Sequence, residues 1–116
     1  MSVGDVDAGA RAVAERLAAL VPAGLRVATC LPPGPAAVET IFGLARLGAV
    51  EVPLAPDLPP AAVRALARAA EVGLAVVSTA VLAHNPQLAG VLGEAGPVLL
   101  VGEPDTAHDG GLARLG

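Results

Sequence analysis

The sequence contains no lysine, tryptophan or tyrosine, and its seven basic residues are all arginines. It has a single phenylalanine and a single cysteine, Cys30. The arginines are spread along the chain and the net charge is −4. Nucleic-acid binding favours clustered cations and stacking aromatics, so this composition argues against a nucleic-acid partner. One cysteine also excludes a disulfide framework and a cysteine-based zinc finger.

A long hydrophobic run is absent as well. The longest largely apolar stretch covers residues 72–83 and is interrupted by Ser78 and Thr79. This stretch is shorter than the ~18–20 residues that a transmembrane helix needs. The chain also opens without the charged, apolar and small-residue pattern of a secretion signal. Together with the lone Cys30, which suits a reducing compartment, these absences predict a cytoplasmic protein without membrane contact.

What the sequence has in abundance is alanine. Alanine occurs 26 times, hydrophobic residues make up 54% of the chain, and the mean hydropathy is +0.68. Disordered chains are poor in apolar residues and rich in charge, so this chain is expected to fold. The apolar content also exceeds what one small domain can hide, which predicts a homo-oligomer or a partner protein.

Helix-like and strand-like periodicities alternate along the chain. Helices are predicted over residues 10–21, 35–47, 59–71, 79–83 and 87–92. Strands are predicted over residues 26–31, 49–54, 74–78 and 97–102. Near-continuous apolar strands are typical of a parallel sheet covered on both faces. We therefore expect an α/β fold: a four-stranded, mostly parallel sheet with helices on both faces, in a Rossmann-like or flavodoxin-like three-layer arrangement.

The expected strand order is 2-1-3-4, with right-handed crossovers. We expect residues 1–103 to form a single α/β domain and residues 104–116 to form a flexible tail.

Two local features concern which side chains are buried. The helix over residues 35–47 is expected to stop at Gly48 and to bury one apolar stripe, consisting of Val38, Ile41, Phe42 and Ala45. Glu51 interrupts a strand that otherwise appears buried, so it is expected to face solvent at an edge, lie in an interface or mark an open sheet face.

Two segments carry a resemblance to a known family. Residues 26–35 read RVATCLPPGP, and residues 44–56 read LARLGAVEVPLAP. This order of motifs resembles the N-terminal region of the adenylate-forming ligases, which include acyl-CoA synthetases, adenylation domains of nonribosomal peptide synthetases and luciferase-like enzymes. In that family a strand of the form RVAxxLPNS precedes a helix that ends in LKAGAxxVPL. The resemblance covers residues 10–103 and implies the first fifth of a full-length enzyme.

The sequence departs from that family where the chemistry resides. The family cradles ATP phosphates in a loop of the form SGTTGxPKG, and no such segment occurs here. The family's magnesium-binding acid, its ribose-binding aspartate and its C-terminal catalytic lysine are also missing. Chemistry on a triphosphate depends on positioned positive charge. The resemblance therefore implies a truncated relative with no catalytic, cofactor-binding or metal-binding residues and no cofactor of its own.

Several residues could form sites but also suit simpler structural roles. The turn over residues 32–35 precedes a helix N-terminus, where anions bind, but its prolines lack N–H donors and favour a structural turn. Cys30 before this turn is expected to be a core residue rather than a nucleophile. Glu39 and Glu51 could form a carboxylate pair, but Glu39 follows Val38 on its helix and is expected to point outward.

The two histidines are not expected to bind a metal ion. His84 and His108 lack cysteine or acidic partners at ligand spacing. His84 is expected in a surface turn, and His108, flanked by Asp105 and Asp109, is expected in a solvated tail.

We expect this chain to act by binding another protein rather than by catalysing a reaction. The leading hypothesis is a truncated adenylate-forming-ligase-like protein that acts through protein–protein interaction. Its partner would be a second copy or an enzyme of a natural-product or acyl-activation pathway. One alternative is the N-terminal piece of a split acyl- or aminoacyl-adenylating ligase that is active only in trans. The others are a small pocket protein that binds an acid at the carboxyl ends of the strands, and a fragment of a longer chain.

Overall fold

A computed structural model describes residues 3–101 and 112–115, with side chains described for residues 8–101. The helices are α1 (Val3–Leu17), α2 (Pro35–Arg46), α3 (Pro60–Ala69), α4 (Thr79–His84) and α5 (Gln87–Gly93). The strands are β1 (Arg26–Cys30), β2 (Val50–Pro53), β3 (Leu74–Ser78), β4 (Val98–Val101) and β5 (Leu112–Leu115). None of the helices in the described ranges has the length and hydrophobicity that a bilayer-spanning segment requires.

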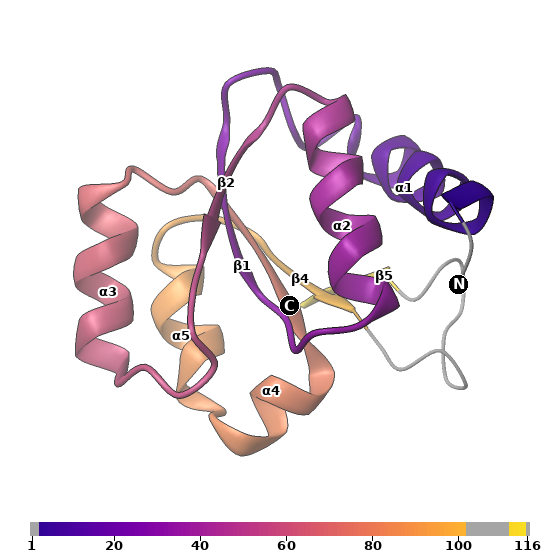
Figure 1. The fold of residues 1–116 in the computed structure, drawn as a ribbon. Helices are drawn as coiled ribbons and strands as arrows, with labels where there is room; N and C mark the ends of the chain where they lie inside the picture. Colours follow the sequence, from indigo (N-terminus) through magenta and orange to yellow (C-terminus); the bar gives the residue numbers. More distant parts are fainter. Residues whose placement is uncertain (1–2, 102–111, 116) are drawn as a thin grey trace.

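The strands form one sheet in the order β2-β1-β3-β4-β5 (Figure 1). The first four strands are parallel, with Val27 of β1 level with Glu51 on one side and Leu74 on the other. The predicted α/β fold and the predicted order 2-1-3-4 are confirmed. The fifth strand was not predicted: residues 112–115 pair antiparallel with β4, so that Val98 is level with Leu115. These residues belong to the segment that was expected to be a tail, whose residues 102–111 and 116 lie outside the described part.

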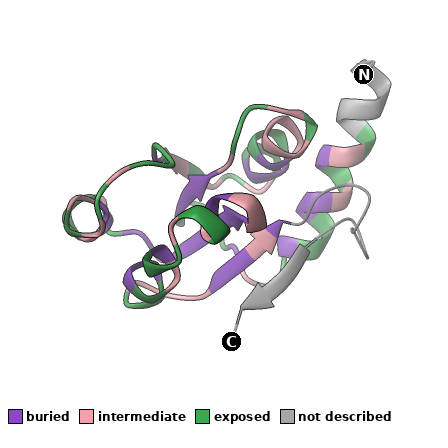
Figure 2. Cartoon of the chain, turned by 90° about the horizontal axis from the view of Figure 1, so that it is seen from below, coloured by how far each residue is buried: buried purple, intermediate pink, exposed green. Residues whose placement is uncertain are grey.

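Helices cover both faces of the sheet and create two cores. On one face, α1 and α2 pack over Val27, Leu74, Val76 and Leu99. On the other face, α3, α4 and α5 pack over Ala28, Cys30, Ala75, Val77 and Val98. All five residues of β3 are buried, since this strand lies in the middle of the sheet. Figure 2 shows the buried residues concentrated along the central strands, with exposed residues on the outer sides of the helices.

Helix α2 ends at a glycine that the sequence predicted. Gly48 has a φ of 73°, in the left-handed region that glycine adopts without a steric penalty. Its N–H donates to the carbonyl of Ala45 at 3.1 Å, and the N–H of Ala49 donates to the carbonyl of Leu44 at 3.0 Å. These two bonds form a Schellman motif, which satisfies the last carbonyl groups of the helix.

Helix α3 ends in the same motif with a glutamate in the glycine position. The N–H of Glu71 donates to the carbonyl of Arg68 at 3.2 Å, and that of Val72 donates to the carbonyl of Ala67 at 2.9 Å. Glu71 has a φ of 54°. Its carboxylate accepts a hydrogen bond from Arg26 Nη1 at 3.0 Å, which joins the end of α3 to the start of β1. The backbone of Glu71 therefore has a conformation that favours glycine, although Glu71 carries a Cβ atom.

Candidate functional site

The outer face of α2 is the most unusual surface among the described residues. The predicted buried stripe faces outward instead: Ile41 is 42% exposed and Phe42 is 51% exposed. Ala45 is exposed and Val38 is partly buried. The residues that α2 buries are Thr40, Gly43 and Leu44. The predicted buried stripe was therefore wrong, and α2 is apolar on both of its faces.

Close packing against α1 sets the rotation of α2. A Cβ atom built on Gly43 would lie 2.8 Å from Val13 Cγ1 and 3.0 Å from the carbonyl oxygen of Ala10. Only glycine permits this approach of the two helices, so Gly43 has to face α1. Leu44, beside it on the helix, is 1% exposed and lies in the core under α1 and α2. With these two residues inward, Phe42 is directed to solvent.

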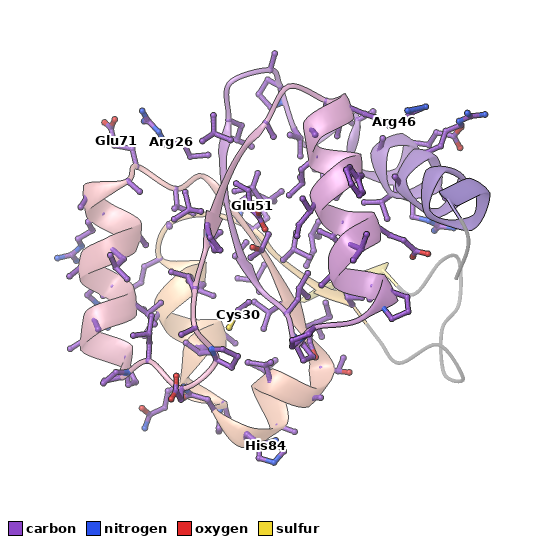
Figure 3. The ribbon with its side chains drawn as sticks, viewed as in Figure 1. Arg26, Cys30, Arg46, Glu51, Glu71 and His84 are labelled. Carbon is purple, nitrogen blue, oxygen red and sulfur yellow. The ribbon has the colours of Figure 1, made fainter. Side chains whose placement is uncertain are left out.

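The neighbouring strand β2 lies at one edge of the sheet. Val50 at its start is 49% exposed. Glu51 is partly buried, and its Oε2 accepts a hydrogen bond from Thr29 Oγ1 at 2.6 Å (Figure 3). Thr29 is buried on β1, so the bond satisfies a buried hydroxyl as well as the carboxylate. Of the positions expected for Glu51, the structure shows the sheet edge, but its side chain is partly buried against β1 rather than directed to solvent.

The open edge of β2 is poorly suited to pairing with another strand. The N–H groups of Val50 and Leu54 point to β1, where they donate to Leu25 at 2.9 Å and Thr29 at 2.8 Å. Because N–H groups alternate in direction along a strand, those of residues 51 and 53 face outward. Residue 53 is Pro53, which has no N–H to donate. Glu51 and Pro53 together therefore protect this edge from strand addition.

Cys30 is a core residue. It is free and buried, and burial raises the pKa of its thiol. A thiol that resists ionisation is a poor nucleophile, in agreement with the structural role expected from the sequence. The turn after Cys30 leads into α2, whose first residue is Pro35. Gly34 forms the N-cap and provides no side-chain hydrogen bond.

The remaining polar candidates do not converge. His84 lies exposed at the end of α4, with Nδ1 3.0 Å from the carbonyl oxygen of Ala80. Glu39 lies against Gly9 of α1, whereas Glu51 contacts β1, so the structure directs the two carboxylates to different neighbours. Within the described ranges, no three His, Cys, Asp or Glu side chains gather as a metal site would require. His108, Asp105 and Asp109 lie outside the described residues.

A groove lies between α3 and α5, and no local sequence pattern indicates it. Its volume is about 200 Å³, and its floor is formed by Ala67, Val72, Val91 and Ala95. Arg64 spans it, donating from Nε and Nη2 to the two carboxylate oxygens of Glu94 at 3.0 and 2.9 Å. This hydrogen-bonded ion pair lowers the pKa of Glu94 and raises that of Arg64. The two residues are 30 positions apart, so no local pattern connects them.

Comparisons with known proteins agree with the resemblance found in the sequence. A model of the family described as AMP-binding enzyme matches residues 1–111. A search of the curated proteins finds no match.

Solved structures share the fold of this chain. The apo structure of MatB from Rhodopseudomonas palustris is similar at a TM-score of 0.75 and 22% identity, over 88% of this chain and 20% of MatB. An acyl-CoA synthetase from Brucella canis has a TM-score of 0.70 and 27% identity, over 90% of this chain and 18% of that one. A Mycobacterium tuberculosis fatty acyl CoA synthetase has a TM-score of 0.71 and 24% identity, over 89% of this chain and 21% of that one.

This chain thus spans about a fifth of the length of the structures that it matches. The family match extends over far more than half of the chain, and the matching structures have the same arrangement of strands and helices. This chain belongs to the AMP-binding enzyme family.

Proposed function

We propose that this chain acts through protein–protein contact, as an α/β unit of the adenylate-forming ligase type that has no catalytic groups of its own. The observation that carries the proposal is the outer face of α2, where Ile41 and Phe42 are about half exposed. Helices on the surface of a globular protein are normally apolar on one side only. A helix that is apolar on both sides requires cover on the second side as well.

The charges of the chain support a role in contact rather than catalysis. Adenylation places strong negative charge on phosphate oxygens, which enzymes stabilise with positioned cations. The sequence has no lysine. Among its arginines, Arg64 is engaged with Glu94, and Arg26 is engaged with Glu71. These pairs hold elements of the fold together, which leaves them poorly placed to bind a triphosphate.

A second candidate function is activity in trans. The chain would then supply one part of an acyl- or aminoacyl-adenylating ligase whose other parts lie on another polypeptide. The observation that favours it is the coverage: the match includes 88% of this chain but only 20% of MatB. In this case the outer face of α2 and the adjacent Val50 would be covered by the rest of the ligase fold.

An ATP–pyrophosphate exchange assay separates the two candidates. The 116-residue chain alone, supplied with ATP and a panel of carboxylic acids, is expected to give no exchange. Exchange by the chain alone would contradict the proposal. The chain is then mixed with the Brucella canis acyl-CoA synthetase from which the matched segment has been deleted. Exchange restored by this mixture supports activity in trans.

Two variants test whether such restoration depends on α2. Phe42→Glu places a charge on its outer face. Leu66→Glu changes a comparably exposed residue, 44% exposed, on α3 at the other face of the sheet. Only the first substitution should lower the exchange rate of the mixture, since only Phe42 lies on the proposed contact.

A further inference from the structure

We propose that β5 is a cover that the chain supplies for the outer edge of β4, and that this edge pairs with the same edge of a second copy when β5 is displaced. This inference goes beyond the proposed function, because it concerns the sheet edge opposite β2 and no part of α2. The strands lie in the order β2-β1-β3-β4-β5, so without β5 the sheet would end at β4 (Figure 1).

The backbone of β4 directs alternate residues to its two neighbours. The N–H of Ala75 in β3 donates to the carbonyl of Pro97 at 3.0 Å, and Ala75 is level with Val98. In a parallel pair, this bond places the N–H and C=O groups of residues 97, 99 and 101 toward β3. The backbone groups of Val98 and Leu100 therefore point to the other side of β4, where β5 lies.

The register of β5 satisfies those backbone groups. Val98 is level with Leu115, and Leu100 is level with Ala113. Antiparallel residues whose backbone groups face each other exchange both hydrogen bonds of the pair. Ala113 and Leu115 therefore pair with β4, whereas the N–H of Arg114 points away from it. Without β5, the outward N–H and C=O groups of β4 would have no strand partner.

The edge of β4 lacks the features that protect the edge of β2. The sequence of β4 is VLLV, which contains neither a proline nor a charged residue. At β2, by contrast, Pro53 lacks a donor and Glu51 carries a charge. An apolar edge with unpaired N–H and C=O groups is a template for pairing with another chain. β5 replaces this edge with the sequence LARL, whose arginine is a residue type that discourages strand pairing.

The pairing of β5 is also the part of the sheet that is easiest to disrupt. β5 has four residues and lies at the end of the sheet, whereas β3 is buried at the centre. Peripheral elements open at lower free energies than central strands do. The family match covers residues 1–111, so β5 also lies outside the part of the chain that matches the family. Displacement of β5 therefore exposes the edge of β4 while the remaining strands persist.

Two proline variants of the full chain differ in the backbone group that they remove. Ala113→Pro removes an N–H that points to β4, whereas Arg114→Pro removes one that points outward, which a sheet edge tolerates. Hydrogen exchange of single amides, followed by NMR, reports on each side of β4. In Ala113→Pro, exchange at Val98 and Leu100 should be at least about tenfold faster than in the original chain. In Arg114→Pro, it should stay within about threefold of the original.

Leu99 and Val101 are internal controls, because their N–H groups point to β3. Their exchange should stay slow in both variants, which also shows that the variants are folded. If Ala113→Pro accelerates exchange at Leu99 and Val101 as well, β5 is part of the core rather than a separable cover, and the inference is overturned. Exchange at Val98 that does not change in Ala113→Pro, or that changes equally in both variants, also overturns it.

Self-association tests what the uncovered edge does. In sedimentation equilibrium at about 0.5 mM, Ala113→Pro should have a weight-average mass at least about 1.5-fold above that of Arg114→Pro. Equal masses would overturn the inference. Both variants are then measured with Phe42→Glu added, which alters the outer face of α2. The difference in mass should persist in this background, and its loss would place the contact on α2 and overturn pairing through β4.

Discussion

The two Schellman motifs provide a stability test in which the same kind of substitution has opposite effects. Glu71 ends α3 with a φ of 54°, and Gly48 ends α2 with a φ of 73°. Both helix ends have the same pair of backbone hydrogen bonds. We predict that Glu71→Gly stabilises the protein and that Gly48→Ala destabilises it.

The expected magnitudes follow from three contributions. Left-handed backbone costs an ordinary residue about 1–2 kcal/mol, and glycine avoids that cost. Glycine loses about 0.5–1 kcal/mol relative to alanine because its unfolded chain is more flexible. Glu71→Gly also removes the ion pair with Arg26, whose side chains are 46% and 79% exposed, so its loss costs at most about 0.5 kcal/mol. The sum favours glycine at position 71 by about 0.5 kcal/mol.

Glu71→Ala separates the ion pair from the backbone effect. It removes the carboxylate but retains a Cβ in the left-handed region, so it should destabilise the protein by about 0–0.5 kcal/mol. Gly48→Ala adds a Cβ in the same conformation, and that atom would lie 3.4 Å from the Cβ of Ala23. We expect Gly48→Ala to lower the free energy of unfolding by about 0.5–1 kcal/mol.

Urea denaturation at pH 7 measures all three variants, and thermal melting should show shifts of about 2–4 °C. The decisive comparison is Glu71→Gly against Glu71→Ala, because both lack the ion pair. If Glu71→Gly is no more stable than Glu71→Ala, the cost of the left-handed backbone at position 71 does not exceed the greater flexibility of glycine in the unfolded chain, and the reasoning is refuted.

Three further predictions concern the packing and the charges. Gly43→Ala should destabilise the protein by about 1–2 kcal/mol, because its Cβ would meet Val13 at 2.8 Å. Gly90→Ala in α5, where a Cβ meets nothing within 4 Å, should stabilise it by up to about 1 kcal/mol in the same urea titration; equal effects at both positions would contradict the packing argument. Glu94→Gln should destabilise the protein at pH 7, and the difference from the original chain should shrink as the pH falls. The lowered pKa of Glu94 gives stability that is present above its unfolded value and is lost as the pH falls through the folded value, so a pH-independent effect would argue against the ion pair. The buried thiol of Cys30, whose pKa is raised, should react with a thiol reagent at pH 8 at least about 100-fold more slowly in the native protein than in guanidinium; comparable rates would show that it is accessible.

Local signals predicted the architecture well. The strand over residues 74–78 is a run of apolar residues bounded by turn signals, and the structure buries it at the centre of the sheet. Gly48 predicted the end of α2, because glycine favours the left-handed conformation found there. The buried strand and the helix end are both determined by residues that are neighbours in the sequence, so the sequence alone predicts them.

Features that depend on distant residues were missed. The ion pair of Arg64 and Glu94 joins two helices 30 positions apart, and neither residue has an informative local pattern. Strand β5 has the sequence LARL, which lacks the β-branched and aromatic residues that favour strands, so its sequence does not distinguish it from a tail. Glu71 in the left-handed region contradicts the preference of its residue type, so only the backbone geometry reveals it.

The error on α2 has a different origin, and it bears directly on function. Periodicity identifies a buried face only when the opposite face is polar. On α2 both faces are apolar, and the choice between them was made by Gly43, whose missing Cβ permits contact with α1. A small residue gives little signal in a hydrophobicity pattern although it determines the rotation of the helix. The larger residues, Ile41 and Phe42, are thereby left on the outside. The stripe that the hydrophobicity pattern indicates as core is thus the surface most in need of cover.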